Sequence, residues 1–133
     1  MEQDPIVKVL RDYLGSQPAV RAAYLYGSVA RGSAGPESDV DVAVLLGAGE
    51  PPALQNEALR IEGDLERRLG RTVQVVALEL APVDLVHAVL RDSVLLSEAD
   101  RSARIRFEVR SRNEYFDLLP FLRRYRRLGE QTA

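Results

Sequence analysis

The sequence predicts one α/β domain, in which helices pack on a small β-sheet. Three observations lead to this fold class. The chain has 133 residues and 46% hydrophobic content, which suits a single domain with a real core. Some segments repeat apolar residues at helical spacing, and short apolar runs stand between them. Their order, helix–strand–strand–helix–strand–helix–helix, is typical of helices that cover a sheet.

The N-terminal part of the chain supplies the first three elements. Apolar residues recur at helical spacing over residues 6–14, and Gly15 ends that helix. Residues 20–26 form a short apolar run that predicts a strand. Residues 40–46 are almost continuously apolar, which predicts a strand buried on both faces. Only the loop 27–38 joins the two strands, so they either pair antiparallel or diverge, and the sequence leaves both open.

The middle of the chain continues the alternation. Residues 52–69 place one apolar residue on each turn of a single helical stripe, and a glycine follows. Residues 72–78 are short and β-branched, which indicates a third strand. Residues 82–90 begin with a proline that suits the first turn of a helix. Residues 93–98, SVLLSE, predict a short extended segment.

The composition excludes several classes of protein. The chain has no cysteine, which rules out disulfides and thiolate metal sites and fits a reducing compartment. The N-terminal stretch MEQDPIVKVL lacks the basic and apolar regions of a signal peptide, and no apolar run approaches membrane-spanning length. We therefore expect a cytoplasmic protein without a membrane partner.

Two aspartates stand at the start of the run 40–46. If Val40 lies in a strand, Asp39 and Asp41 point to the same side, roughly 6–7 Å apart. Buried carboxylates are costly unless they are paired or bound to metal, and oxygen-only ligands favour Mg²⁺. Such a pair suits nucleotidyl transfer, in which metal ions hold the attacking and leaving oxygens. The plain alternative is an edge strand with two solvated acids.

Gly27 and Ser28 follow the run 20–26 directly. A glycine there lets the backbone approach a ligand, and Ser28 is placed to cap a short helix through Arg31. The N–H groups of such a helix start suit a triphosphate. Arg31 is placed either to neutralise developing charge or to pair with the nearby acids. Gly-Ser turns are common, but one followed by two acids before an apolar strand favours a nucleotide site.

The pattern GS-x-ARG followed by SD-x-D resembles the signature of the DNA polymerase β-like nucleotidyltransferase superfamily. The small size and flanking segments most resemble the minimal nucleotidyltransferases, the MNT proteins, which act as antitoxins in HEPN/MNT toxin–antitoxin pairs. The resemblance extends to GRTVQVVAL, VLRDSVLLSEADR and FEVRSRNEYFDLLPFLRRY, and so covers most of the chain.

The resemblance implies a polymerase β-like core with a small mixed sheet and C-terminal helices. It implies that Asp39 and Asp41 are catalytic and bind two Mg²⁺ ions, with ATP as the substrate. It also implies that AMP passes to a tyrosine of a HEPN ribonuclease toxin and silences it. Adenylyltransferases of small molecules usually carry an extra substrate domain, for which 133 residues leave little room. The resemblance also implies that Gly27 and Ser28 hold the triphosphate, and we expect Arg31 and Ser38 to complete the nucleotide site.

One position departs from the family pattern. The family has a third carboxylate on the strand after the long helix, and here Gln74 stands at that place in VQVV. A glutamine accepts hydrogen bonds but cannot serve as a base. Glu79 would face the opposite side of a continuous strand, and Asp84 fits a helix better. Either the chain works with two aspartates and a base from solvent or the target, or it is a degenerate member that neutralises the toxin by binding.

The charge is divided unevenly along the chain. Residues 1–100 carry a net charge of −7 and residues 101–133 a net charge of +5. We therefore divide the domain into an α/β core, 1–98, and a helical segment, 99–133, in which Pro120 predicts a break or kink. The aromatic and arginine residues of this segment favour core packing together with partner binding. Nucleic-acid binding ranks below both, because the arginines are spread around the helix.

His87 is the only histidine of the chain. It stands among apolar residues of a predicted helix, with no second metal ligand in register. We therefore expect it to serve packing or to lie at the surface.

Overall fold

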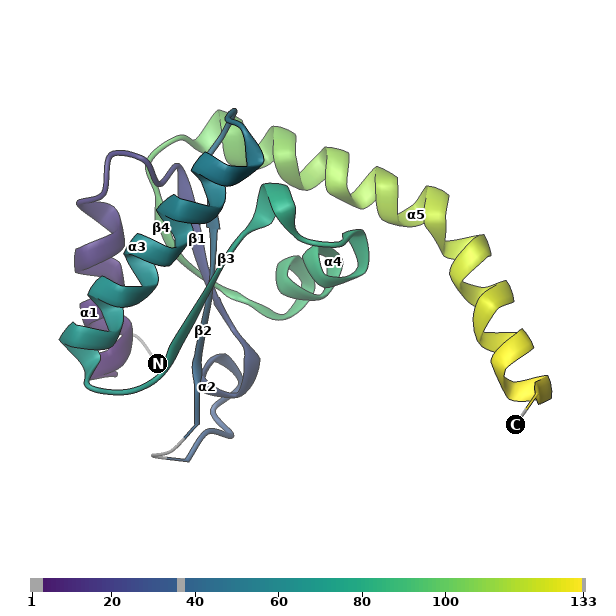
Figure 1. The fold of residues 1–133 in the computed structure, drawn as a ribbon, viewed down its shortest axis with the longest axis horizontal. Helices are drawn as coiled ribbons and strands as arrows, with labels where there is room; N and C mark the ends of the chain where they lie inside the picture. Colours follow the sequence, from purple (N-terminus) through teal and green to yellow (C-terminus); the bar gives the residue numbers. More distant parts are fainter. Residues whose placement is uncertain (1–3, 36–37, 133) are drawn as a thin grey trace.

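The computed structural model describes residues 4–35 and 38–132. A four-stranded sheet lies between two layers of helices (Figure 1). Across the described residues, no helix combines the length and apolarity that crossing a bilayer requires. In chain order the elements are α1 (Pro5–Gly15), β1 (Ala22–Tyr26), α2 (Gly27–Arg31), β2 (Val40–Leu45), α3 (Pro51–Leu69), β3 (Val73–Ala77), the 3-10 turn η1 (Leu78–Leu80), α4 (Val83–Asp92), β4 (Val94–Glu98) and α5 (Arg101–Thr132).

The strands lie in the order β3-β2-β1-β4. β1 runs antiparallel to β2 and to β4, whereas β2 runs parallel to β3. The sheet is therefore mixed, as the family resemblance implies. The pairing left open by the sequence is antiparallel: β1 and β2 are neighbours, with Tyr26 opposite Asp41. The chain reverses direction between them through α2 and the loop that follows it.

Each face of the sheet has its own layer of helices. Val40, Val42 and Val44 of β2 join the core beneath α1 and α3. The alternate residues Ala43 and Leu45 pack under α4 and α5. The expectation that this strand is buried on both faces is confirmed, since only Asp41 interrupts its burial.

The outer edge of β3 is covered by two acidic side chains of α3. Glu62 Oε1 accepts a hydrogen bond from the Val75 N–H at 3.0 Å, and Glu66 Oε2 accepts one from the Val73 N–H at 3.3 Å. An open strand edge invites pairing with other chains, and these contacts satisfy its donors. They also hold β3 in place beside β2.

The start of α1 follows known capping preferences, and the structure corrects the predicted start of α4. Asp4 caps α1 by accepting the Ile6 N–H at 2.9 Å, with Pro5 in the first turn. The helix predicted over 82–90 begins at Val83. Pro82 is its N-cap and not part of its first turn, because the Pro82 backbone is extended, with ψ of 151°.

The C-terminal segment is one helix, where the sequence predicted helices separated by a break or kink. Asp100 Oδ1 accepts the Ala103 N–H at 3.0 Å and so caps the start of α5. The helix continues through Pro120 without a break. A proline removes one helical hydrogen bond and crowds the preceding turn, and the axis of α5 bends in its second half (Figure 1).

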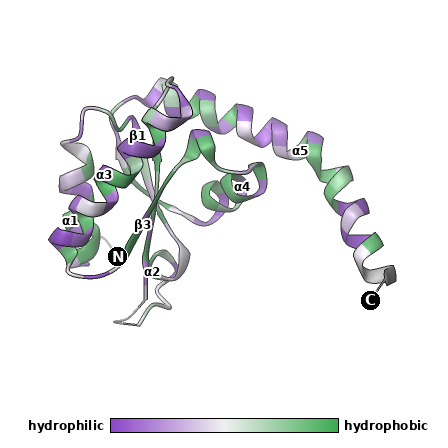
Figure 2. Cartoon of the chain, viewed as in Figure 1, coloured by the Kyte–Doolittle hydropathy of each residue, from purple (hydrophilic) through white to green (hydrophobic). Residues whose placement is uncertain are grey.

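The two halves of α5 differ in their surroundings. In the first half, Phe107 and Ser111 are buried, and the Tyr24 hydroxyl donates to Glu108 Oε2 at 2.9 Å. Burial, reinforced by this bond to Glu108, raises the pKa of Tyr24. The second half extends away from the sheet (Figure 1), and there Phe121, at the edge of a hollow beside Val83, is 63% exposed and Tyr125 is 78% exposed. Apolar and charged residues alternate along it (Figure 2).

Candidate active site

The predicted acid pair lies at the beginning of the central strand β2. Asp41 lies between Tyr26 on β1 and Gln74 on β3, which are its partners in the strand register. Because Val40 and Val42 point toward α1 and α3, Asp41 points to the opposite face, which carries α4 and α5. Asp39 precedes the strand and is exposed. The Gln74 side chain, which shares the face of its register partner Asp41, donates to Asp39 Oδ2, so both acids lie on the same side of the sheet, as predicted.

Gly27 lies directly against the carboxylate of Asp41. Its φ of +74° belongs to the left-handed region, which glycine enters at little cost. A Cβ built on Gly27 would overlap Asp41 Oδ2. Only glycine therefore fits at this position. Because Gly27 has no side chain, the backbone at the start of α2 lies directly against the Asp41 carboxylate.

The electrostatics of the site are dominated by two neighbouring acids. Burial raises the pKa of Asp41, the negative charge of Asp39 raises it further, and the Arg31 guanidinium opposes both effects. Burial and then the charge of Asp41 raise the pKa of Tyr26. Like charges that repel across a half-buried site are relieved by a bound cation.

The donors of the site suit a hard divalent cation. Asp39 and Asp41 offer carboxylate oxygens only, the ligands that Mg²⁺ prefers, and water and phosphate oxygens can complete its shell. Within residues 4–35 and 38–132, no group of three or more Asp, Glu, His or Cys side chains is arranged to hold a metal ion. The two carboxylates thus fit Mg²⁺, and among the described residues no third acid joins them.

Gln74 occupies the place that the resemblance assigned to a third carboxylate. It is the register partner of Asp41, and its Nε2 donates to Asp39 Oδ2 at 3.2 Å. The nearby acids do not replace it. Glu79 lies in η1, where its Oε2 accepts the backbone N–H groups of Leu46 and Gly47 at the other end of β2. Asp84 is exposed on α4.

The predicted nucleotide residues are placed differently from one another. Ser28 does not cap α2, because the left-handed Gly27 starts the helix and Tyr26 becomes the N-cap. In the part of the chain that the structure describes, Ser28 Oγ has no hydrogen-bond partner. Arg31 lies in the last turn of α2, near enough to Asp41 to influence its pKa. Ser38 Oγ is engaged in the loop, where it accepts the Gly35 N–H at 3.0 Å.

Sequence reasoning missed two residues that shape the site. Tyr26 borders Asp41 on β1, and the only signal in the sequence was its position directly before Gly27. Arg71 donates to the carbonyls of Gly35 and Ser38 and so ties the loop before Asp39 to the end of α3. No local sequence pattern predicts this contact, because Arg71 is more than 30 residues from Gly35 and Ser38 in the sequence.

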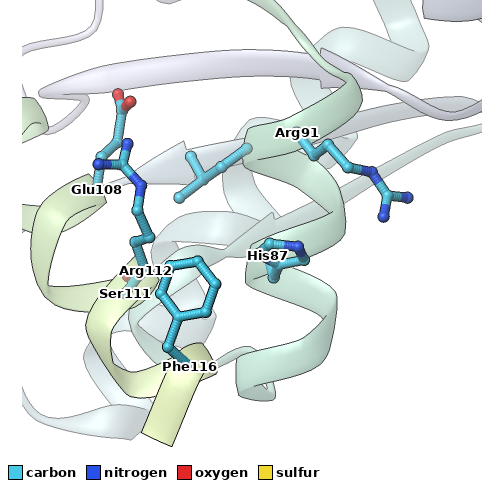
Figure 3. A pocket seen from close by; sticks show the side chains of 7 residues that line it. His87, Arg91, Glu108, Ser111, Arg112 and Phe116 are labelled. Atoms are coloured by element: carbon cyan, nitrogen blue, oxygen red, sulfur yellow. The ribbon is translucent and has the colours of Figure 1, made fainter. Parts of the chain in front are cut away.

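A cavity of about 240 Å³ lies between α4 and α5. His87 and Phe116 point into it, whereas Arg91 points away (Figure 3). The His87 ring stacks on Tyr115 with centroids 3.5 Å apart. The packing role expected for His87 is confirmed.

The comparison with protein families decides the classification. The family described as polymerase beta, nucleotidyltransferase, matches residues 8–102. The chain belongs to this nucleotidyltransferase family. The match spans the sheet, α2 and the acid pair, so the family resemblance and the fold class predicted from the sequence are both confirmed. A search of proteins with curated functions found no significant match.

Solved structures resemble the chain over its whole length. A toxin–antitoxin with AMP-PNP is 25% identical, with 100% of both chains covered and a TM-score of 0.68. The MntA–HepT toxin–antitoxin is also 25% identical, with 96% of this chain and 94% of that chain covered and a TM-score of 0.61. A tri-AMPylated Shewanella oneidensis HEPN toxin in complex with MNT antitoxin is 20% identical over 96% and 99%, with a TM-score of 0.65, which supports the fold alone.

Proposed function

We propose that this nucleotidyltransferase is a Mg²⁺-dependent antitoxin that transfers AMP from ATP to a tyrosine of a HEPN ribonuclease toxin. The observation that carries the proposal is the Asp41 carboxylate packed against Gly27, with Asp39 beside it on the same face. A cytoplasmic location follows from the proposal, because a ribonuclease toxin acts on RNA there.

The residues of the site divide the work of the transfer. Asp39 and Asp41 would hold Mg²⁺, which supplies positive charge to the triphosphate and the reacting oxygens. Gly27 leaves room for phosphate beside Asp41, and Arg31 adds positive charge at the same place. The tyrosine oxygen forms a bond to the α-phosphorus, the bond to pyrophosphate breaks, and the hydroxyl proton passes to solvent. Ser28 and Ser38 belong to the proposed nucleotide site. The Ser28 hydroxyl has no hydrogen-bond partner among the residues that the structure describes, and Ser38 contributes through the loop that it holds.

The similar structures support this chemistry by analogy. One of them, which is 25% identical, is a toxin–antitoxin with AMP-PNP, an ATP analogue. The complex whose HEPN toxin carries three AMP groups shares the fold with this chain. The first covers 100% of this chain and the second 96%, so the likeness includes the C-terminal helical segment.

We place the toxin on the distal half of α5, residues 119–132. Phe107 is buried in the core, and steps of three or four residues along the same helix face lead through Leu118, which lines a hollow beside Val83, to Phe121 and Tyr125. These last two rings are exposed, and arginines flank them in the run RRYRR. A partner with an apolar surface and an acidic rim would bury the rings and pair the arginines.

A second candidate function rests on Gln74. An amide in place of an acid removes a potential base, and a lost general base typically costs about a hundred- to ten-thousand-fold in rate. In that case the chain is a degenerate MNT antitoxin that neutralises the toxin by binding alone.

The deciding experiment mixes the chain with Mg²⁺, ATP labelled at the α-phosphate and the HEPN protein encoded by the neighbouring gene. We expect label on the toxin, and no label with the Asp39→Asn/Asp41→Asn double variant. Label that appears only with Gln74→Asp would establish the degenerate antitoxin. Absence of label with both the wild type and Gln74→Asp would contradict the transferase.

A further inference from the structure

Gln74 makes a specific contact at the acid pair. It lies on β3 directly across from Asp41, yet its amide reaches Asp39, with Nε2 3.2 Å from Oδ2. The orientation of the amide follows from charge, because the opposite orientation would set the Gln74 carbonyl oxygen against a carboxylate oxygen. One oxygen of Asp39 is therefore engaged by an N–H donor.

This contact limits how many cations the site can hold. An ion bound with the triphosphate obtains phosphate and water oxygens in addition to the two carboxylates. A second ion near the attacking hydroxyl has fewer phosphate ligands and depends more on carboxylates of the protein. Among the residues that the structure describes, Asp39 and Asp41 form a pair without a third acid, and Gln74 already donates to one of them.

We propose that the chain binds one divalent ion per nucleotide, held by Asp39 and Asp41, and that the Gln74 amide takes the place of a second ion at Asp39. Gln74 is then a positioning residue: it holds the Asp39 carboxylate by hydrogen bonding. The inference rests on the proposed function in one respect, namely that the nucleotide binds at this acid pair.

The number of bound ions gives a direct test. Equilibrium dialysis with Mn²⁺ and saturating AMP-PNP measures the Mn²⁺ retained by the protein in excess of the free nucleotide complex. We expect one Mn²⁺ per wild-type chain and two for Gln74→Asp, in which a carboxylate replaces the amide. Gln55→Asp is the matched control, because it adds the same charge at an exposed position of α3, on the other face of the sheet, and should retain one ion.

A second variant tests the positioning role. Gln74→Ala should keep the stoichiometry of one but bind Mn²⁺ about fivefold more weakly, the effect of one lost hydrogen bond. Gln74 is exposed, so these variants should unfold at the same temperature as the wild type. Two ions in the wild type, or one in Gln74→Asp, would overturn the inference while leaving the transferase intact. If calorimetry finds no AMP-PNP binding by any variant, the proposed function fails as well.

Discussion

The acidic end of the sheet and the distal half of α5 differ in how their side chains are satisfied. At the sheet end, Gly27 lies against the Asp41 carboxylate, and Gln74 on the neighbouring strand donates to Asp39 and is the register partner of Asp41. On the distal half of α5, large rings such as Tyr125 extend into solvent.

The difference separates chemistry from recognition. A close-packed polar site has a built-in geometry, which catalysis requires. An exposed apolar helix face gains free energy only when another surface covers it. Changes at the sheet end should therefore alter metal and nucleotide binding without affecting the complex, and changes on distal α5 should do the reverse.

The largest effect that we expect is a loss of toxin binding when Phe121 and Tyr125 are replaced, and it tests the separation of the two regions. Replacing both with Asp should weaken binding to the HEPN toxin by more than about a hundredfold, since central aromatic residues cost about 2–4 kcal/mol each when lost. Mn²⁺–AMP-PNP binding should not change. Calorimetry with each ligand measures both.

The matched control uses the outer face of the proximal half of α5. Ile105 and Val109 are 42% and 46% exposed, and replacing both with Asp should leave toxin binding within a few-fold of the wild type. If the two double variants weaken binding equally, the docking surface is not confined to distal α5.

We expect a smaller effect, on unfolding free energy and nucleotide binding, when alanine replaces glycine at the sheet end. Gly27 and Gly32 share a φ of +74°, but an added Cβ meets Asp41 at Gly27 and nothing at Gly32. Gly32→Ala should cost about 1 kcal/mol of unfolding free energy through strain alone. Gly27→Ala should cost more, about 2–3 kcal/mol with the overlap added, and should also weaken Mn²⁺–AMP-PNP binding.

Denaturant unfolding and dialysis of the two variants measure these effects. Equal losses of stability, with nucleotide binding intact in both, would show that the close approach of Gly27 to Asp41 has no role in the site.

The smallest effect that we expect is on stability, at Tyr13, which is distant from both regions. The Tyr13 hydroxyl donates to Asp64 Oδ2 at 2.6 Å between α1 and α3. Burial, together with this bond to Asp64, raises the pKa of Tyr13 to about 12 from 10.0. Because the folded state holds the Tyr13 proton more tightly than the unfolded state does, the protonated hydroxyl stabilises the fold. This stabilisation is complete below pH 10 and is lost as the pH rises toward 12.

Tyr13→Phe should therefore lower the unfolding free energy by about 1 kcal/mol at pH 7 and reduce the loss of stability above pH 10. Metal, nucleotide and toxin binding should not change. Tyr125→Phe, at a position 78% exposed, is the control and should leave stability unaltered. Equal pH profiles for wild type and Tyr13→Phe would argue against the hydrogen bond.

Local patterns predicted much of the architecture and part of the site. The common side of Asp39 and Asp41 follows from the two-residue period of a strand, which needs no knowledge of the rest of the fold. The positions of the strands and of α1, α3 and α4 follow from equally local spacing.

Other features depend on contacts between distant segments. The register that sets Gln74 beside Asp41 joins residues 33 positions apart in the sequence. The pairing of β1 with β2 was open for another reason, because a short loop permits either an antiparallel pair or two diverging strands. The cap of α2 was misassigned to Ser28, because Gly27 adopts a left-handed conformation against Asp41 and the helix begins there, with Tyr26 as its N-cap. The engagement of Ser38 with Gly35 is a loop contact that no periodicity reveals.

The central claim is that the acid pair beside Gly27 is the metal–nucleotide site. Crystals of the chain grown with Mn²⁺ and AMP-PNP test it most directly, because Mn²⁺ is located by its anomalous scattering. The account predicts an anomalous peak in contact with both Asp39 and Asp41, with the triphosphate beside Gly27. Bound nucleotide elsewhere on the chain, with no peak at these two carboxylates, would contradict it.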